Sequence, residues 1–321
     1  MRGFELPAPL KGVIPPMVTP LNGRNSLDVA GLERLVEHLL AGGVHGLFIL
    51  GSTGEGPSLS DRLKHELLER VCRQVNGRVP VLVGITDSSF EESLNLAHRA
   101  ADAGAEAVVL APPFYFPLNQ DDLTAYIKNM ADKISLPMFL YNMPSLTDIN
   151  FELSTIESLM SHPKIVGLKD SSGNMVYFHK VRQLVSRDPK FSLFMGPEEL
   201  LPEAILAGAH GGVCGGANLA PQLYVRLYEA AVAGDLPLVR KLQDRVLKIS
   251  SSIYAVGRSS SSYLAGLKCA MACLGICEDH LEEPLRCLSR KDRAQIQQNV
   301  NALALEFPAE RANLLKFPKS N

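Results

Sequence analysis

One lysine lies at the end of an apolar run, where it has the surroundings needed for chemistry. Residues 165–173 read Ile-Val-Gly-Leu-Lys-Asp-Ser-Ser-Gly, which is typical of a buried parallel strand that ends near Lys169 and enters a loop. Lysine is rarely buried. An amine withdrawn from water loses stability in its charged form, and the neutral amine can attack a carbonyl to form a Schiff base. For this stretch alone, a strand-end lysine that extends into solvent is the alternative.

Alternation along this strand predicts what surrounds the lysine. Gly167 shares a face with Lys169, and we expect it to leave an open volume behind the amine. Asp170 points to the opposite face, so we expect it to make a structural hydrogen bond rather than to take part in catalysis.

A tyrosine ends a second apolar run, over residues 138–141. Tyr141 has the same parity as Phe139, so we expect it to point into the interior of the fold, as Lys169 does. A phenol beside an amine can shuttle protons while a carbinolamine forms and collapses. A core tyrosine whose hydroxyl is satisfied by the backbone is the alternative.

A hydroxyl-rich turn follows a third run, over residues 44–50. Ser52, Thr53 and Gly54 place hydroxyls and backbone N–H groups just before a helix, which can form a cradle for a carboxylate. A plain turn between strand and helix is the alternative. Further candidates follow other apolar runs: Tyr115, Glu198, Glu199, Val213 and Gly215.

The elements that must position these groups alternate regularly along the chain. Eight apolar runs with strand character are separated by amphipathic helices, and they cover residues 12–18, 44–50, 79–85, 107–111, 138–141, 165–169, 191–195 and 211–214. This alternation predicts a (β/α)₈ TIM barrel of the α/β class, whose active site lies at the carboxyl ends of the strands.

Strand signals stop after Gly234. The sequence predicts helices over 236–253, 262–274 and 291–303, and we expect serines 259–262 to cap the second of them. The predicted organisation is therefore a barrel over residues 1–233 that carries the active site, with a C-terminal helical appendage over residues 234–321.

Composition narrows the possible partners and surroundings. The 321 residues are 46% hydrophobic and 21% charged with a net charge of −2, which argues against partners such as nucleic acid or a membrane surface that need a basic field. No apolar run is long enough to span a bilayer, and the first residues lack a signal-like core, so we expect a cytoplasmic protein. Cys269, Cys273 and Cys277 are spaced as along one helix side, and we interpret them as buried hydrophobes rather than metal ligands.

Three motifs together are more specific than any one of them. Gly51-Ser52-Thr53-Gly54-Glu55, Tyr141-Asn142-Met143-Pro144 and residues 167–173 resemble, in order and at the expected strand ends, the signatures of the dihydrodipicolinate synthase / N-acetylneuraminate lyase family. The similarity runs over roughly residues 11 to 300.

The resemblance implies a class I aldolase that holds pyruvate as an imine on Lys169, with Tyr141 as the acid–base group. It implies that Ser52 and Thr53 hold the carboxylate with Gly54 in the same cradle, and that Ser52 relays protons to Tyr141. Tyr115 matches the second relay tyrosine, which in the family reaches across into a neighbouring subunit's site. The resemblance also implies a homotetramer, the usual assembly of the family. No metal and no organic cofactor is expected.

The substrate is narrowed by departures from the family patterns. Leu146 stands where dihydrodipicolinate synthases carry an arginine that grips a substrate carboxylate. Gly215 replaces a serine of sialic acid lyases, whereas Glu198 and Glu199 fall where those enzymes hold sugar hydroxyls. The set of residues looks more like that of the aldolases for 2-keto-3-deoxy sugar acids or 4-hydroxy-2-oxoglutarate. This resemblance implies a small hydroxylated 2-oxo acid and an aldehyde as partners.

Four alternatives stay open at this point. Three are enzymes: dihydrodipicolinate synthase itself, N-acetylneuraminate lyase, and a dehydratase of keto-deoxy sugar acids. The fourth is a barrel without catalytic activity that only binds and senses a 2-oxo acid.

Overall fold

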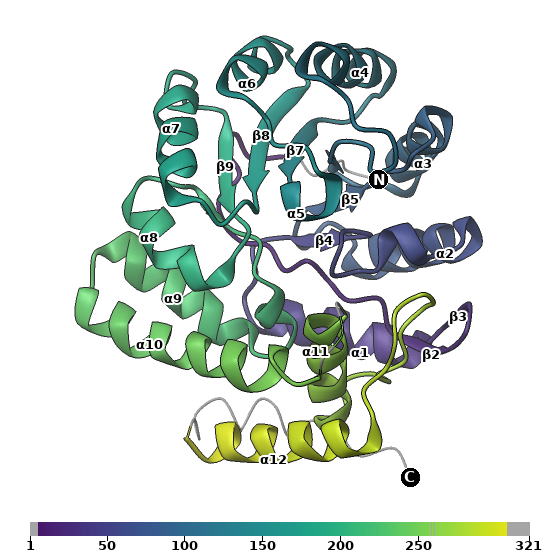
Figure 1. Cartoon of the computed structure of the whole chain (residues 1–321), viewed down its shortest axis with the longest axis vertical. Coiled ribbons are helices and arrows are strands. Elements are labelled where there is room, and N and C mark those ends of the chain that lie inside the picture. Colours follow the sequence, from purple (N-terminus) through teal and green to yellow (C-terminus); the bar gives the residue numbers. More distant parts are fainter. Residues whose placement is uncertain (1–5, 258, 260, 307–321) are drawn as a thin grey trace.

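A curled sheet of eight parallel strands with helices around it forms the framework of the molecule (Figure 1). The computed structural model describes residues 6–257, 259 and 261–306. The strands follow the order β1-β10-β9-β8-β7-β6-β5-β4. Their bounds are β1 Gly12–Val13, β4 Leu47–Ile49, β5 Val81–Gly84, β6 Ala107–Leu110, β7 Met138–Asn142, β8 Ile165–Asp170, β9 Ser192–Met195 and β10 Gly211–Gly212.

Backbone hydrogen bonds also connect the first segment of the chain with β4. The N–H of Met17 donates to the carbonyl of Phe48 at 2.8 Å, and the N–H of Phe48 donates to Pro15 at 3.0 Å. The N–H of His45 donates to Val13 at 2.9 Å. The eight predicted strands are thus all present in one parallel sheet.

The helices follow the predicted alternation closely. Their bounds are α1 Val29–Ala41, α2 Asp61–Val75, α3 Phe90–Ala103, α4 Gln120–Lys133, α5 Pro144–Thr147, α6 Leu153–Met160, α7 Met175–Val185, α8 Leu201–Leu206, α9 Pro221–Ala233, α10 Leu236–Ile249, α11 Ser262–Cys273 and α12 Arg290–Glu306. Side-chain caps begin several of them. Asp28 accepts from the N–H of Gly31 at α1, and Ser60 accepts from the N–H of Leu63 at α2.

Several short elements were not predicted. Strands β2 (Leu21–Gly23) and β3 (Ser26–Leu27) form a separate antiparallel pair, and α5 is a single turn after β7. Three-residue strands and one-turn helices leave too few positions for a periodic pattern to show in the sequence.

The C-terminal helices show two differences from the prediction. Ser261 is the N-cap residue of α11 but makes no capping hydrogen bond with its side chain, and Ser260 lies outside the described residues. Cys277 lies beyond the end of α11, so the three cysteines do not share a helix. Residues 1–5 and 307–321, at the two ends of the chain, belong to the two predicted units. These residues also lie outside the described part.

The core has two apolar layers. The larger lies between strands and helices, and the smaller lies on the inner face of the curled sheet, where its members include Phe48, Phe139, Tyr141 and Phe194. Phe139 and Tyr141 share this cluster, as their alternation predicts. In the described part of the chain, no helix has the length and apolar character needed to cross a membrane.

Candidate active site

Lys169 and Tyr141 are neighbours on adjacent strands at the carboxyl end of the sheet. The register of β7 and β8 pairs Tyr141 directly with Lys169. The Lys169 amine lies 4.0 Å from the centre of the Tyr141 ring and 5.2 Å from that of Phe48. The Lys169 residue is only 7% exposed, and within the described residues no carboxylate lies at ion-pair distance from its amine. The predicted pairing of the two side chains is therefore present.

The volume behind Lys169 is filled, contrary to the prediction. A Cβ built on Gly167 would lie 2.4 Å from the ring of Phe139, the residue beside it on β7. Gly167 therefore makes room for the aromatic ring rather than leaving an open space. The amine of Lys169 faces the rings of Tyr141 and Phe48.

The phenol of Tyr141 has an acid–base environment set by its neighbours. Burial would raise its pKa, but the Lys169 amine and hydrogen bonds to Ser52, Lys169 and Ser171 outweigh burial, so the pKa is lowered. The hydroxyls of Tyr141 and Ser52 are 3.4 Å apart. Tyr141 can therefore lose and regain a proton more readily than an ordinary tyrosine.

The loop after β4 holds Ser52 and Thr53 in a strained turn. Leu50 and Glu55 have left-handed backbones, with φ of 59° and 58°. A Cβ on Gly56 would lie 2.1 Å from the Leu50 carbonyl oxygen, so this close approach requires glycine. The carbonyl of Gly54 accepts a hydrogen bond from the Thr19 hydroxyl at 2.6 Å.

A buried ion pair anchors the same loop to the C-terminal helices. The Lys268 amine of α11 lies 2.6 Å from Glu55 and donates to the carbonyl of Thr19 at 2.8 Å. Both charged side chains are 0% exposed. The second oxygen of Glu55 accepts from the N–H of Glu282 at 2.8 Å. No motif in the sequence marks Lys268, because its partner Glu55 is 213 positions away.

Asp170 has the structural role expected for it. Its carboxylate accepts from the Asn142 amide at 2.8 Å and from the N–H and hydroxyl of Ser172, both at 3.0 Å. Burial is the main cause of its raised pKa. These bonds hold the end of β8 next to β7 and so keep Lys169 in place.

Glu198 differs from the expectation that it would hold substrate hydroxyls. One oxygen accepts from the N–H of Gly216 at 2.6 Å, and the other accepts from the hydroxyls of Tyr224 and Tyr254 at 2.6 and 2.7 Å. Burial raises the pKa of this carboxyl to about 7. Glu199 accepts from the hydroxyl of Ser250. Protein donors thus already occupy both oxygens of Glu198.

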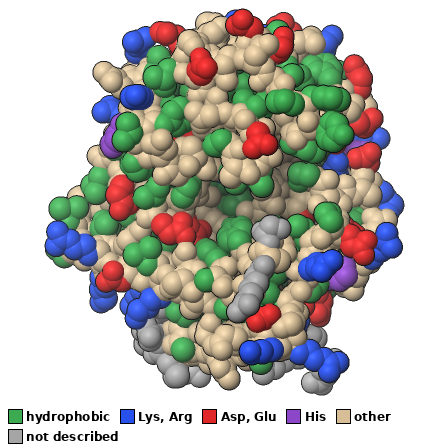
Figure 2. All heavy atoms as spheres, in the orientation of Figure 1, with side chains coloured by type: hydrophobic (Ala, Val, Ile, Leu, Met, Phe, Trp, Pro, Cys, Tyr) green, Lys and Arg blue, Asp and Glu red, His purple; other side chains and the backbone are tan. Residues whose placement is uncertain are grey.

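A cavity of about 580 Å³ brings most of the predicted site residues together. Among its lining residues are Lys169, Tyr141, Ser52, Thr53, Glu198, Glu199, Val213 and Gly215. Gly54 is not a lining residue, although it is buried beside Thr53. In the space-filling view the molecule is hollowed near the centre of its face, with hydrophobic side chains in the hollow (Figure 2).

The C-terminal region also lines this cavity. The prediction had placed the whole site within residues 1–233. Tyr254, Ser261, Tyr263, Leu264 and Leu285 line it. The hydroxyl of Tyr263 lies 3.4 Å from that of Thr53. No motif in the sequence marked these residues, since they belong to helices and loops without strand-end positions.

Tyr115 lies outside this cavity. It is 76% exposed and contacts the ring of Phe116 at 5.1 Å between centroids. A second, smaller cavity of about 220 Å³ borders Ser52 and Tyr141 and is lined also by Phe114 and Leu146. Within one chain, Tyr115 lines neither cavity.

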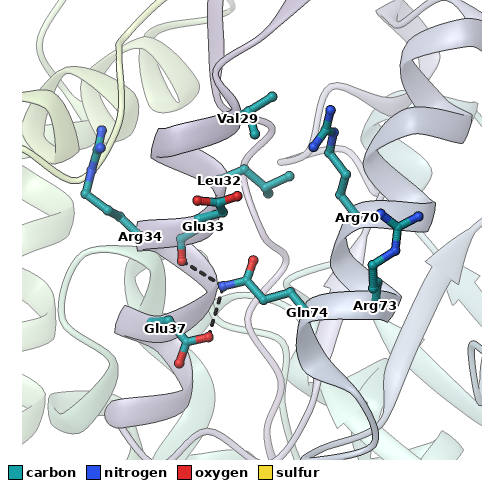
Figure 3. Close-up of a pocket in the computed structure, with 8 residues that line it drawn as sticks. All are labelled: Val29, Leu32, Glu33, Arg34, Glu37, Arg70, Arg73 and Gln74. Atoms are coloured by element: carbon teal, nitrogen blue, oxygen red, sulfur yellow. Dashed lines mark hydrogen bonds between the residues drawn. The ribbon is translucent and has the colours of Figure 1, made fainter.

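Another cavity, of about 510 Å³, lies between α1 and α2 in the helical layer. Gln74 extends from α2 toward α1, where its amide donates to the carbonyl of Glu33 and to the carboxylate of Glu37, both at 2.9 Å (Figure 3). The cavity is away from the strand ends, and this fold places catalysis at the strand ends. We therefore assign the site to the cavity around Lys169.

Comparison with known proteins agrees with the motifs and the fold. The profile described as "Dihydrodipicolinate synthetase family" matches residues 9–303. The chain belongs to this family. The 4-hydroxy-tetrahydrodipicolinate synthase of Neisseria meningitidis serogroup B is 30% identical over 91% of this chain and 98% of its own. The family is one of lyases, so the predicted enzyme class is confirmed.

Solved structures of the family have the same fold. The dihydrodipicolinate synthase from Bacteroides thetaiotaomicron is 50% identical, with a TM-score of 0.90, covering 92% of this chain and 99% of its own. The structure of YagE from Escherichia coli K12, solved in complex with pyruvate, is 28% identical with a TM-score of 0.86, over 92% of this chain and 99% of its own.

Proposed function

We propose that the protein is a class I aldolase that forms or cleaves a small hydroxylated 2-oxo acid, with pyruvate bound as an imine on Lys169. The observation that supports this most is the position of the Lys169 amine in the cavity, against Tyr141 and with no carboxylate partner among the described residues. The pyruvate complex of YagE supports the choice of the 2-oxo acid.

The proposed cleavage begins at the C2 carbonyl of the substrate. The neutral amine of Lys169 adds to C2, and the carbinolamine loses water to give the imine. A base removes the proton of the C4 hydroxyl, the C3–C4 bond breaks, and its electron pair moves into the enamine while the aldehyde leaves. Protonation of C3 and hydrolysis then release pyruvate and the free lysine. No metal or organic cofactor is needed in this scheme.

Tyr141 is the proposed acid–base group for these proton transfers. Its lowered pKa favours the phenolate that takes the C4 hydroxyl proton, and its position beside the amine suits proton transfer during loss of water. Ser52, at 3.4 Å from the phenol, would relay protons to it. The hydroxyls of Ser52 and Thr53 with the backbone of Gly54 would hold the carboxylate, and Val213 and Gly215 would line the pyruvate pocket.

The favoured substrates are 2-keto-3-deoxy sugar acids or 4-hydroxy-2-oxoglutarate. Leu146 lines the cavity. By the resemblance of the motifs, it occupies the sequence position at which dihydrodipicolinate synthases carry a carboxylate-binding arginine. To test this, a panel of these acids is incubated with the protein and pyruvate release is measured. We expect release from at least one of them, and no release from any would contradict the proposal.

Dihydrodipicolinate synthase is the second candidate, because relatives bear that name. It predicts that pyruvate and aspartate semialdehyde are consumed together in a coupled assay. Consumption in that assay, without pyruvate release from the acid panel, would replace the first candidate by the second.

A homotetramer is the assembly we propose. Tyr115 and Phe116 are 76% and 73% exposed in a loop rich in proline, and large apolar residues so exposed favour a protein contact. In a tetramer, Tyr115 of one subunit would complete the hydroxyl relay of a neighbour. We expect four chains per particle by analytical ultracentrifugation, and we expect Tyr115→Phe to lower turnover.

We also propose that the sheet closes into a (β/α)₈ barrel. The hydrogen bonds from residues 13–17 to residues 45–48, and the parallel bridge from Pro16 to Phe48, support closure between the two ends of the sheet. The division at residue 233 and a cytoplasmic location stay predictions.

A further inference from the structure

Tyr263 brings a hydroxyl from the C-terminal region to the proposed carboxylate cradle. It lies in the first turn of α11 and lines the main cavity. Its hydroxyl is 3.4 Å from that of Thr53, which is a long contact that a ligand can replace at little cost. The side chain therefore lies where the substrate carboxylate is expected.

Gly215 and Tyr263 fit each other closely. A Cβ built on Gly215 would lie 1.7 Å from the Tyr263 hydroxyl oxygen and 3.0 Å from the ring carbon that bears it. Gly215 does not have a positive φ, so glycine is required here for space and not for backbone conformation.

The Tyr263 hydroxyl is fixed in place and keeps its proton. Its ring packs edge-on against that of Tyr254, with centroids 4.7 Å apart, and Tyr254 in turn donates to Glu198. Burial raises the pKa of Tyr263, and the charge of Glu198 adds to this. At neutral pH, Tyr263 is therefore a hydrogen-bond donor.

Ser52, Thr53 and Tyr263 supply neutral hydroxyl donors to the cavity. Among the described lining residues, Lys169 is the one cation, and imine formation uses its nitrogen. An ionised carboxylate has room for about four hydrogen bonds. Each hydrogen bond from such a hydroxyl contributes more binding free energy when the acceptor is charged.

We propose that the hydroxyl of Tyr263 donates to the carboxylate of the imine-bound 2-oxo acid, as a third hydroxyl beside Ser52 and Thr53. This inference rests on the proposed function. In this proposal α11 is part of the substrate site. The Tyr263 hydroxyl can take this position only because residue 215 is a glycine.

The test measures the rate of borohydride trapping on Lys169 against pyruvate concentration for the wild type and Tyr263→Phe. A hydrogen bond to a charged group contributes about 1.5–3 kcal/mol, so half-maximal trapping should need at least about 10-fold more pyruvate in the variant. Tyr177→Phe is the matched control, because it removes a hydroxyl that donates to the carbonyl of Phe151 at 2.8 Å, away from the cavity. We expect Tyr177→Phe to behave as the wild type.

Acetone separates carboxylate binding from a general structural effect, since it forms the same imine without a carboxylate. Tyr263→Phe should leave trapping by acetone unchanged. An unchanged pyruvate dependence, or an equal loss with acetone, would overturn the proposal. Absence of any wild-type adduct on Lys169 would instead overturn the proposed function and the inference with it.

A double-mutant cycle tests the link to Gly215. Gly215→Ala should weaken pyruvate trapping in the wild-type background, because the new methyl group displaces the Tyr263 hydroxyl. In the Tyr263→Phe background, Gly215→Ala should weaken pyruvate trapping clearly less. Equal effects in the two backgrounds would contradict the proposed coupling.

Discussion

Two buried lysines, Lys169 and Lys268, have opposite surroundings. Lys268 is 0% exposed and its amine is paired with Glu55 at 2.6 Å and with the carbonyl of Thr19. Lys169 is nearly as buried, yet its amine faces the rings of Tyr141 and Phe48 in a cavity. A paired amine is held as a structural cation, whereas an amine beside a phenol and a cavity is available to a carbonyl. Burial alone therefore does not identify a nucleophile.

The two acids near these lysines differ in the same way. Glu55 is neutralised by Lys268, whereas Glu198 is surrounded by hydroxyls and one backbone N–H. The paired acid and base fix the loop that carries Ser52 and Thr53. Lys169 and Glu198 line the cavity without such a partner among the described residues, whereas Glu55, which also lines it, is paired with Lys268.

Replacing the unpaired lysine should have the largest effect on activity. Lys169→Met removes the proposed nucleophile, and we expect turnover to fall by at least about 10⁴-fold, as for other covalent catalysts. Its free energy of unfolding should change little, because Lys169 has no ion pair to lose among the described residues. A barrel that only senses 2-oxo acids would still bind pyruvate in this variant, and calorimetry would detect that binding.

Replacing the paired lysine should have the largest effect on stability. Lys268→Met is matched to the first change in size, but it leaves the Glu55 carboxylate buried without a cation. We expect the free energy of unfolding to fall by about 3–5 kcal/mol, measured by urea denaturation. Stability equal to that of the wild type would contradict the distinction between the lysines.

The unpaired acid should make stability depend on pH. The pKa of Glu198 is raised to about 7 from an ordinary value of 4.5. Between pH 4.5 and about 7, this carboxyl is therefore protonated in the folded state and ionised in the unfolded state. Stability from this group is complete below pH 4.5 and is lost as pH rises to about 7. The loss is about 3 kcal/mol.

Glu198→Gln is the variant that isolates this contribution. Its amide can keep the oxygen toward Gly216 and the nitrogen toward the tyrosine hydroxyls. We expect its urea-denaturation profile to be flatter than that of the wild type between pH 4.5 and 7. Parallel profiles would assign the pH dependence to other groups.

The smallest effect is expected at the proposed proton relay between the hydroxyls of Ser52 and Tyr141. Ser52→Ala removes the 3.4 Å contact with Tyr141, worth about 1 kcal/mol, so kcat should fall about 10-fold or less. Because that contact lowers the pKa of Tyr141, the limb of the pH–rate profile that reports this phenol should move to higher pH. A shift to lower pH would be inconsistent with the relay.

Sequence reasoning located the elements and groups that follow from local pattern. The ends of β7 and β8 and the alternation of their side chains placed Tyr141 beside Lys169, and the register confirms their pairing. The hydroxyl-rich turn with Ser52, Thr53 and Gly54 was likewise predicted from its position at the end of a strand, β4. Short elements such as the β2–β3 pair and α5 have too few residues for a period to appear.

Contacts between distant parts of the chain could not be predicted in this way. The open volume expected behind Lys169 is filled by Phe139, a side chain from the neighbouring strand. Lys268 and Tyr263 meet their partners, Glu55 and Thr53, more than 200 positions away. Lys268 lies in an apolar helix much as Lys169 lies in an apolar strand, and only the folded chain shows which of the two is paired.

Lys169, and not Lys268, is the proposed nucleophile. Borohydride treatment with pyruvate, followed by proteolysis and mass spectrometry, tests this most directly because it locates the adduct. We predict the mass of a reduced pyruvate adduct on the peptide that contains Lys169, with none on the peptide that contains Lys268. An adduct on Lys268, or no adduct on Lys169, would contradict the account.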